Sequence, residues 1–185
     1  MLERLFGKSP VQCSADALYF TAVEQARQSD FFTDMGVPDT VDGRFDMIAL
    51  HVFLILRRLK QGDEISQTMA QALFDTMFTD MDRGLRELGA GDLGVGRRVK
   101  AMAKAFYGRV AAYDQGLMST DTDLQEAILR NIFRGEEKER SNALSLASYM
   151  RDQAEKLDHQ SMDALLQGEV MFPSPWAAND AMITS

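Results

Sequence analysis

Hydrophobic residues recur along most of this chain at the three- and four-residue spacing of amphipathic α-helices. The first such segment follows Ser14, which we expect to cap it, and it ends near a turn at residues 35–38. After a second turn at residues 39–43, the run Phe45–Leu59 is apolar on nearly every side. A helix without a polar face belongs in the middle of a bundle.

Later segments repeat this pattern. A third helix is expected from Ser66, and the glycine-rich residues 89–96 separate it from a fourth that ends at Gly116. Helical spacing also predicts further helices between residues 122 and 166, and alternation typical of strands is missing throughout. The sequence therefore predicts an all-α fold, a single bundle-like domain of five to seven helices.

The two ends of the chain differ from this pattern. We expect an N-terminal arm over residues 1–13, the helical domain over 14–167 and an irregular tail over 168–185. Pro173 and Pro175 exclude regular helix in the tail, which is either loose or anchored through Phe172 and Trp176.

Composition excludes several classes of protein. The chain has 185 residues, 28 acidic and 20 basic, a net charge of -8, one cysteine and two histidines. One cysteine cannot form an internal disulfide, and two histidines rarely support a catalytic metal site. We therefore expect no cofactor, no metal, no catalytic residues and no enzymatic activity. Residues 1–10 lack the apolar core of a signal peptide. The most apolar stretch, Met47–Leu56, is well short of the roughly 20 residues that cross a membrane.

Several suggestive motifs have ordinary explanations. Gly89, Gly91 and Gly94 match a dinucleotide-binding fingerprint by letter, but a helix precedes them where that motif needs a strand. We interpret them as a loop between helices. We expect Asp75, Asp80 and Asp82 to lie on a solvated acidic helix face. His51 is expected to be buried and hydrogen-bonded, and His159 to be an ordinary surface histidine.

Basic residues cluster in one segment of this acidic chain. No Asp or Glu interrupts the five cations Arg97, Arg98, Lys100, Lys104 and Arg109. Helical spacing places most of them opposite the apolar side of their helix. Such a face could bind phosphate, as in a ribosome or nucleic acid, an anionic membrane surface or an acidic partner. Alternatively, acidic residues of the preceding helix could neutralise it.

Methionine and phenylalanine are concentrated on the third and fourth helices. Flexible, polarizable side chains of this kind repack around varied apolar partners, although such a stripe also closes any helical bundle. The candidate residues for binding a client protein are Phe74, Met77, Phe78, Met81, Met102, Phe106 and Tyr107.

Sequence motifs in the same region resemble those of a known family. They are the segments 39–46 and 51–60, then 71–75 and 78–87, and finally 91–100, 105–109 and 112–113. Together they resemble the ubiquinol-cytochrome c chaperone family, in a bacterial form, over roughly residues 14–150.

The resemblance implies an assembly factor for the cytochrome bc complex. Mitochondrial members bind newly made cytochrome b, work at the ribosome and use a small partner subunit, of which the sequence gives no indication here. By this resemblance the client is cytochrome b or a similar hydrophobic respiratory protein. The expected location is the cytoplasm, or the cytoplasmic face of the inner membrane.

Two alternatives remain open at this point. The first is a helical module that binds a ribosome or nucleic acid through the basic face of residues 97–109. The second is an enzyme or small-ligand binder with His51 in an open pocket.

Overall fold

A computed structural model describes residues 8–87, 89, 91–119 and 121–173 of the chain. Within these residues the secondary structure is helical, with six long α-helices and two of a single turn, which confirms the all-α prediction. The α-helices are α1 (Pro10–Ala26), α2 (Asp30–Thr33), α3 (Val41–Leu59), α4 (Glu64–Glu87), α5 (Asp92–Met118), α6 (Asp121–Asn131), α7 (Arg140–Asp158) and α8 (Met162–Leu166), and a 3₁₀ turn spans Glu137–Glu139.

Helix α1 begins before Ser14, so the prediction of a cap at that residue is wrong. Ser9 caps the helix instead, because its side-chain oxygen accepts a hydrogen bond from the backbone N–H of Gln12. Pro10 occupies the first turn, where its missing N–H costs nothing. The helix buries an apolar side that includes Leu18 and Ala22.

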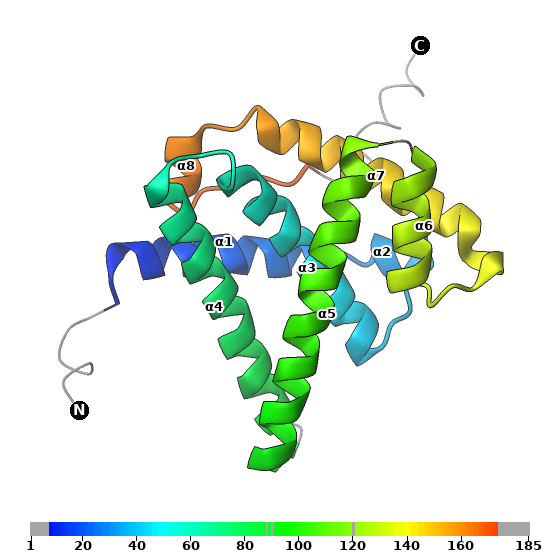
Figure 1. The fold of residues 1–185 in the computed structure, drawn as a ribbon, viewed down its shortest axis with the longest axis horizontal. Helices are drawn as coiled ribbons and strands as arrows, with labels where there is room; N and C mark the ends of the chain where they lie inside the picture. Colours follow the sequence, from blue (N-terminus) through cyan, green and yellow to red (C-terminus); the bar gives the residue numbers. More distant parts are fainter. Residues whose placement is uncertain (1–7, 88, 90, 120, 174–185) are drawn as a thin grey trace.

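Helix α3 lies at the centre of the fold, as its sequence predicts. It packs against α1, α4, α5 and α7, and Figure 1 shows it passing behind the crossing of α5. The helix begins at Val41, inside the expected turn, because the Thr40 side chain accepts a hydrogen bond from Gly43. Consecutive residues from Ala49 to Ile55 are all buried, which explains the absence of a polar face.

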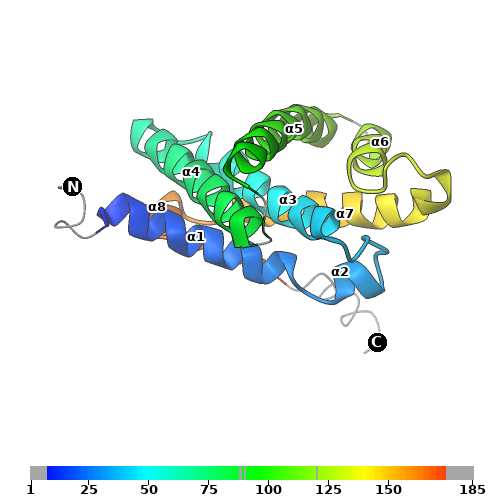
Figure 2. The same cartoon turned by 90° about the horizontal axis from the view of Figure 1, so that it is seen from below.

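Helices α4 and α5 form a long hairpin that projects from the rest of the molecule. They meet at the turn around Gly89 and diverge toward the body, where α3 lies between them (Figure 1). Figure 2 views the molecule from the side on which the hairpin projects. Gly89 has a φ of +83°, which favours glycine and confirms a loop between helices.

Helix α5 continues past Gly116 to Met118, so the prediction that this glycine ends the helix is wrong. Gly116 allows a close approach of α6 instead, because a Cβ atom there would lie 2.8 Å from the Cα of Leu124. Arg151 on α7 donates hydrogen bonds to the carbonyls of Gly116 and Leu117, at 2.8 and 3.1 Å. These bonds satisfy carbonyl groups that the end of α5 leaves without helical partners.

The described part of the tail, residues 168–173, is non-helical and lies against the body. Gln160 exchanges two hydrogen bonds with the backbone of Met171, at 2.8 and 2.9 Å. The ring of Phe172 packs edge-on against His51 with centroids 5.1 Å apart. Phe172 therefore anchors the tail as expected, whereas Trp176 lies outside the described residues.

Candidate functional site

An aromatic cluster joins the two arms of the hairpin. Phe74 and Phe78 on α4 lie 4.6 Å apart, and Phe74 is 5.8 Å from Phe106 and 5.4 Å from Tyr107 on α5 (ring centroids). The ring of Tyr107 is 60% exposed although it contacts this cluster. The cluster therefore continues from the core to the surface.

The structure separates the seven predicted client-binding residues into three groups. Met77, Phe106 and Met81 are buried members of the hydrophobic core. Phe74, Phe78 and Met102 are half-buried, and only Tyr107 of the seven is largely exposed. We use the name hairpin patch for the four residues with exposed surface: Phe74, Phe78, Met102 and Tyr107.

Arg109, one of the five predicted cations, points into the protein. Its guanidinium lies 2.7 Å from the carboxylate of Asp46 on α3, and its Cζ atom lies 5.5 Å from the ring centroid of Phe45. Arg134 contacts the other oxygen of Asp46 at 2.8 Å. Burial raises the pKa of Asp46, and the two guanidiniums oppose that rise. Arg109 therefore fixes α5 to α3 and is not part of an exposed basic surface.

The other four cations are exposed on the first turns of α5. No carboxylate of a described residue lies within 4.0 Å of any of them, so the preceding helix does not neutralise them. The acidic side chains of α4 bind elsewhere: Asp80 contacts Arg83, and Asp82 contacts Arg86 at 2.6 Å. We use the name basic face for Arg97, Arg98, Lys100 and Lys104.

His51 is fully enclosed, as the interpretation of a buried, hydrogen-bonded histidine predicts. Its Nδ1 lies 2.8 Å from the carbonyl of Met47, which can only accept, so Nδ1 carries the proton. Its Nε2 therefore accepts from the hydroxyl of Tyr149 at 2.8 Å, and that hydroxyl accepts from Gln25 at 3.1 Å. Burial lowers the pKa of His51 to about 4. A general base in an open pocket is contradicted by this enclosure.

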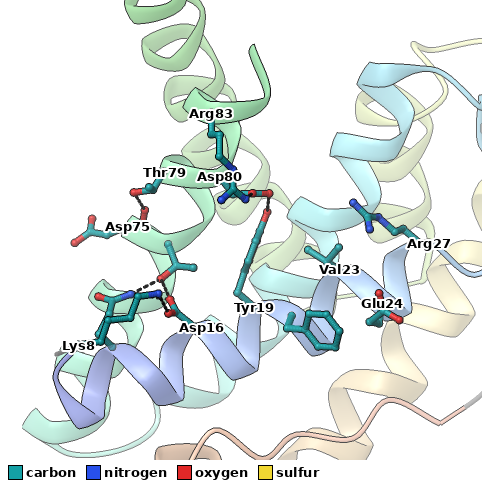
Figure 3. A pocket seen from close by; sticks show the side chains of 13 residues that line it. Lys8, Asp16, Tyr19, Val23, Glu24, Arg27, Asp75, Thr79, Asp80 and Arg83 are labelled. Atoms are coloured by element: carbon teal, nitrogen blue, oxygen red, sulfur yellow. Dashed lines mark hydrogen bonds and ion pairs between the residues drawn. The ribbon is translucent and has the colours of Figure 1, made fainter. Parts of the chain in front are cut away.

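Sequence reasoning missed a polar groove of about 570 Å³ between α1 and α4. Figure 3 shows Tyr19 on α1 reaching Asp80 on α4, to which its hydroxyl donates a 2.9 Å hydrogen bond. Gln12 bridges Asp16 and Thr76 at 2.9 and 2.8 Å. Burial and the neighbouring Asp80 raise the pKa of Tyr19. Because these groups satisfy one another, the groove acts as a polar seam between two helices, and only the spacing of polar residues on both helices could have indicated it.

The remaining candidates stay on the surface. His159 is exposed at the end of α7, and within the described parts of the chain no three His, Cys, Asp or Glu residues form a metal-binding group. None of the described helices combines the length and the hydrophobicity needed to cross a bilayer.

Comparisons with known proteins support the family suggested by the motifs. The model of the family "Ubiquinol-cytochrome C chaperone" matches residues 33–172. The "Ubiquinol-cytochrome-c reductase complex assembly factor 1" of Xenopus laevis is 28% identical over 95% of this chain and 88% of its own. The mitochondrial protein CBP3 of Saccharomyces cerevisiae is 26% identical over 78% of this chain, which spans only 44% of the yeast protein.

A solved structure supports both the family and the fold. The crystal structure of the Cbp3 homolog from Brucella abortus superposes with a TM-score of 0.83, at 35% identity, over 96% of this chain and 99% of that one. This match is in keeping with the expected bacterial form. The family is named for chaperones and the frog relative for an assembly factor, rather than for an enzyme, which confirms the expectation that the protein is not an enzyme. The chain therefore belongs to the ubiquinol-cytochrome c chaperone family.

Proposed function

We propose that this protein is an assembly factor for the cytochrome bc complex that binds a hydrophobic membrane-protein client, such as newly made cytochrome b, at the hairpin patch. Its work would then take place where this client enters the inner membrane, at the cytoplasmic face. Membership of the chaperone family supports the general role, and the frog relative is named as an assembly factor for the reductase complex.

The observation that carries the site assignment is the exposure of Tyr107 at the edge of a continuous aromatic cluster. Tyr107 is 60% exposed, so a client can cover it without displacing other side chains of the protein. Its ring lies 5.4 Å from that of Phe74 (centroids). A client's apolar side chain placed there would contact rings that the protein already holds in position. The protein thus offers an apolar contact without first having to unfold.

Side-chain flexibility supports the same assignment. Met102 is unbranched and polarizable, and it is half-buried against the core, one helical turn before Phe106. A patch that combines adaptable and rigid groups suits transmembrane segments of varied sequence. Met77, Met81 and Phe106 take no part in the proposed contact, because they are buried in the core.

The test is genetic complementation with a matched pair of variants. Deletion of the gene should lower the abundance of the cytochrome bc complex, measured from the absorbance of b-type haem in membranes. Tyr107→Glu should fail to restore it, because a charge at the contact weakens client binding roughly tenfold or more. Leu144→Glu, which changes another exposed apolar residue on α7, should restore it. Unchanged complex levels after deletion would contradict the proposal.

The competing function is a ribosome- or nucleic-acid-binding module that uses the basic face of residues 97–109. The four exposed cations favour it, whereas the pairing of Arg109 with Asp46 reduces the surface available to it. Replacing Arg97, Arg98 and Lys104 with Glu should abolish such binding, which should also be steeply salt-dependent. Ribosome binding that persists in this triple variant would exclude the basic face as the contact.

A further inference from the structure

The basic face occupies one side of the projecting hairpin. Arg97, Lys100 and Lys104 are spaced three and four residues apart on α5, so their exposed side chains share a face. Ala101 lies between these cations and Gly108 follows them, and both are exposed. Because neither has a large side chain, this face of the helix has few protrusions apart from the cations. Figures 1 and 2 show that this end of α5 stands clear of the other helices apart from α4.

The rest of the protein has the opposite charge. The segment from Gly94 to Tyr113 contains no Asp or Glu, and without its five cations the chain retains 15 basic residues against 28 acidic ones. An anionic surface would attract the basic face and repel the body. Glu87 ends α4 at the turn, so the attraction is directed through the side of α5 and not through this end of α4.

From this charge separation we propose that the first turns of α5 dock the protein on an anionic lipid bilayer through Arg97, Arg98, Lys100 and Lys104. A low, convex helix face with cations and an adjoining tyrosine matches the headgroup region of a bilayer, where Tyr is favoured. Tyr107 follows Lys104 by three residues and Lys100 by seven, so it borders the same face.

A bilayer fits this surface better than a nucleic acid does. Single-stranded nucleic acids bind in positively charged grooves that follow the backbone, with exposed aromatic rings on which bases stack. The two grooves along α4 are not positively charged: the larger one, against α1, mixes carboxylates such as Asp80 with cations such as Arg83, and the smaller one carries Asp75 and Asp82. The basic face is therefore a convex contact, and neither of these grooves includes any of its four cations.

The docking inference does not depend on the client assignment. If both hold, the bilayer would meet the protein beside Tyr107, so a membrane-embedded client could reach the hairpin patch without leaving the lipid. The vesicles used below contain no client protein, so failure of either proposal is distinguishable from failure of the other.

Vesicle co-sedimentation with the full chain tests the inference. The protein should bind vesicles of phosphatidylcholine with about 30% phosphatidylglycerol, but not phosphatidylcholine alone, and binding should weaken as salt is raised. Each cation removed from the basic face should weaken binding roughly fivefold, so Lys100→Gln/Lys104→Gln should bind roughly 25-fold more weakly.

The matched control removes the same charge elsewhere. Lys60→Gln/Lys138→Gln changes two exposed lysines that lie near acidic residues away from the basic face, and it should bind like the wild type. Equal losses in both double variants would show a net-charge effect and overturn the inference, as would equal binding to neutral vesicles. Tighter binding to a single-stranded RNA oligonucleotide than to the anionic vesicles, lost in the same variant, would assign the face to nucleic acid instead.

Discussion

Arg109 on α5 and Asp46 on α3 form a buried ion pair at 2.7 Å, and this pair connects the projecting hairpin to the centre of the fold. Arg109 follows Asp46 by 63 residues in the sequence, yet it is held by this carboxylate of the central helix and by the ring of Phe45. The orientation of α5, and hence of its exposed face, depends on this contact.

Asp46→Asn should destabilise the protein by about 3 kcal/mol, because it leaves the buried guanidinium of Arg109 without its counter-charge. The free energy of unfolding in urea measures this loss. Asp39→Asn is the matched control, since it removes a carboxylate 2.7 Å from Arg44 at the exposed start of α3. We expect no measurable change in the control. Equal losses in the two variants would show that burial of the pair is unimportant.

His51 should make stability depend on pH in the mildly acidic range. Its pKa is about 4 in the folded protein against an ordinary 6.5, so the unfolded chain binds a proton at higher pH than the folded one does. The stability that follows is fully present above about pH 6.5 and is lost as the pH falls toward 4.

Between about pH 7 and pH 5 this one group should reduce the free energy of unfolding by about 2 kcal/mol. In His51→Gln the free energy of unfolding in urea should fall by about 2 kcal/mol less over this pH range, because the titrating group is gone. His159→Gln, which removes the chain's other imidazole, is the control and should behave like the wild type. An unchanged pH dependence in His51→Gln would contradict the assignment of a neutral, buried imidazole.

Tyr149→Phe should cost about 1–2 kcal/mol of stability, because it leaves both the His51 Nε2 and the Gln25 amide without their buried partner. Thermal unfolding followed by circular dichroism would detect this change. Tyr107→Phe removes an exposed hydroxyl and should leave the transition where it is. If the two variants unfold alike, the hydrogen-bonded chain from Gln25 to Met47 does not contribute to stability.

Two glycines of α5 should respond to the same substitution with opposite signs. Gly116→Ala should destabilise by roughly 1–3 kcal/mol, because its Cβ would lie 2.8 Å from the Leu124 backbone. Gly108→Ala meets no atom within 4 Å and should stabilise the helix by roughly 0.5–1 kcal/mol. Unfolding midpoints in urea measure both, and destabilisation by Gly108→Ala would indicate a close contact at that face.

Helical spacing predicted the long helices and the central position of α3 because burial on all sides leaves a visible apolar run. The starts of helices were harder to predict, since Ser9 and Ser14 are both good caps and only Pro10 distinguishes them. Gly116 looked like a stop because the sequence cannot show that another helix packs against it.

The candidate site was predicted only in part, because the sequence does not show how helices pack against one another. Spacing identified the aromatic and methionine positions, but it could not separate the buried Met77 from the exposed Tyr107, because burial depends on how the helices pack in three dimensions. The partner of Arg109 is Asp46, from a helix far away in the sequence, so no local pattern could reveal that this cation faces inward.

Site-specific photocrosslinking in respiring cells tests most directly whether the hairpin patch holds a membrane-protein client. A photoreactive amino acid at position 107 should capture newly made cytochrome b, identified by mass spectrometry, whereas the same group at position 144 on α7 should not. Capture of cytochrome b from position 144 but not from position 107, or from neither, would contradict the proposed site.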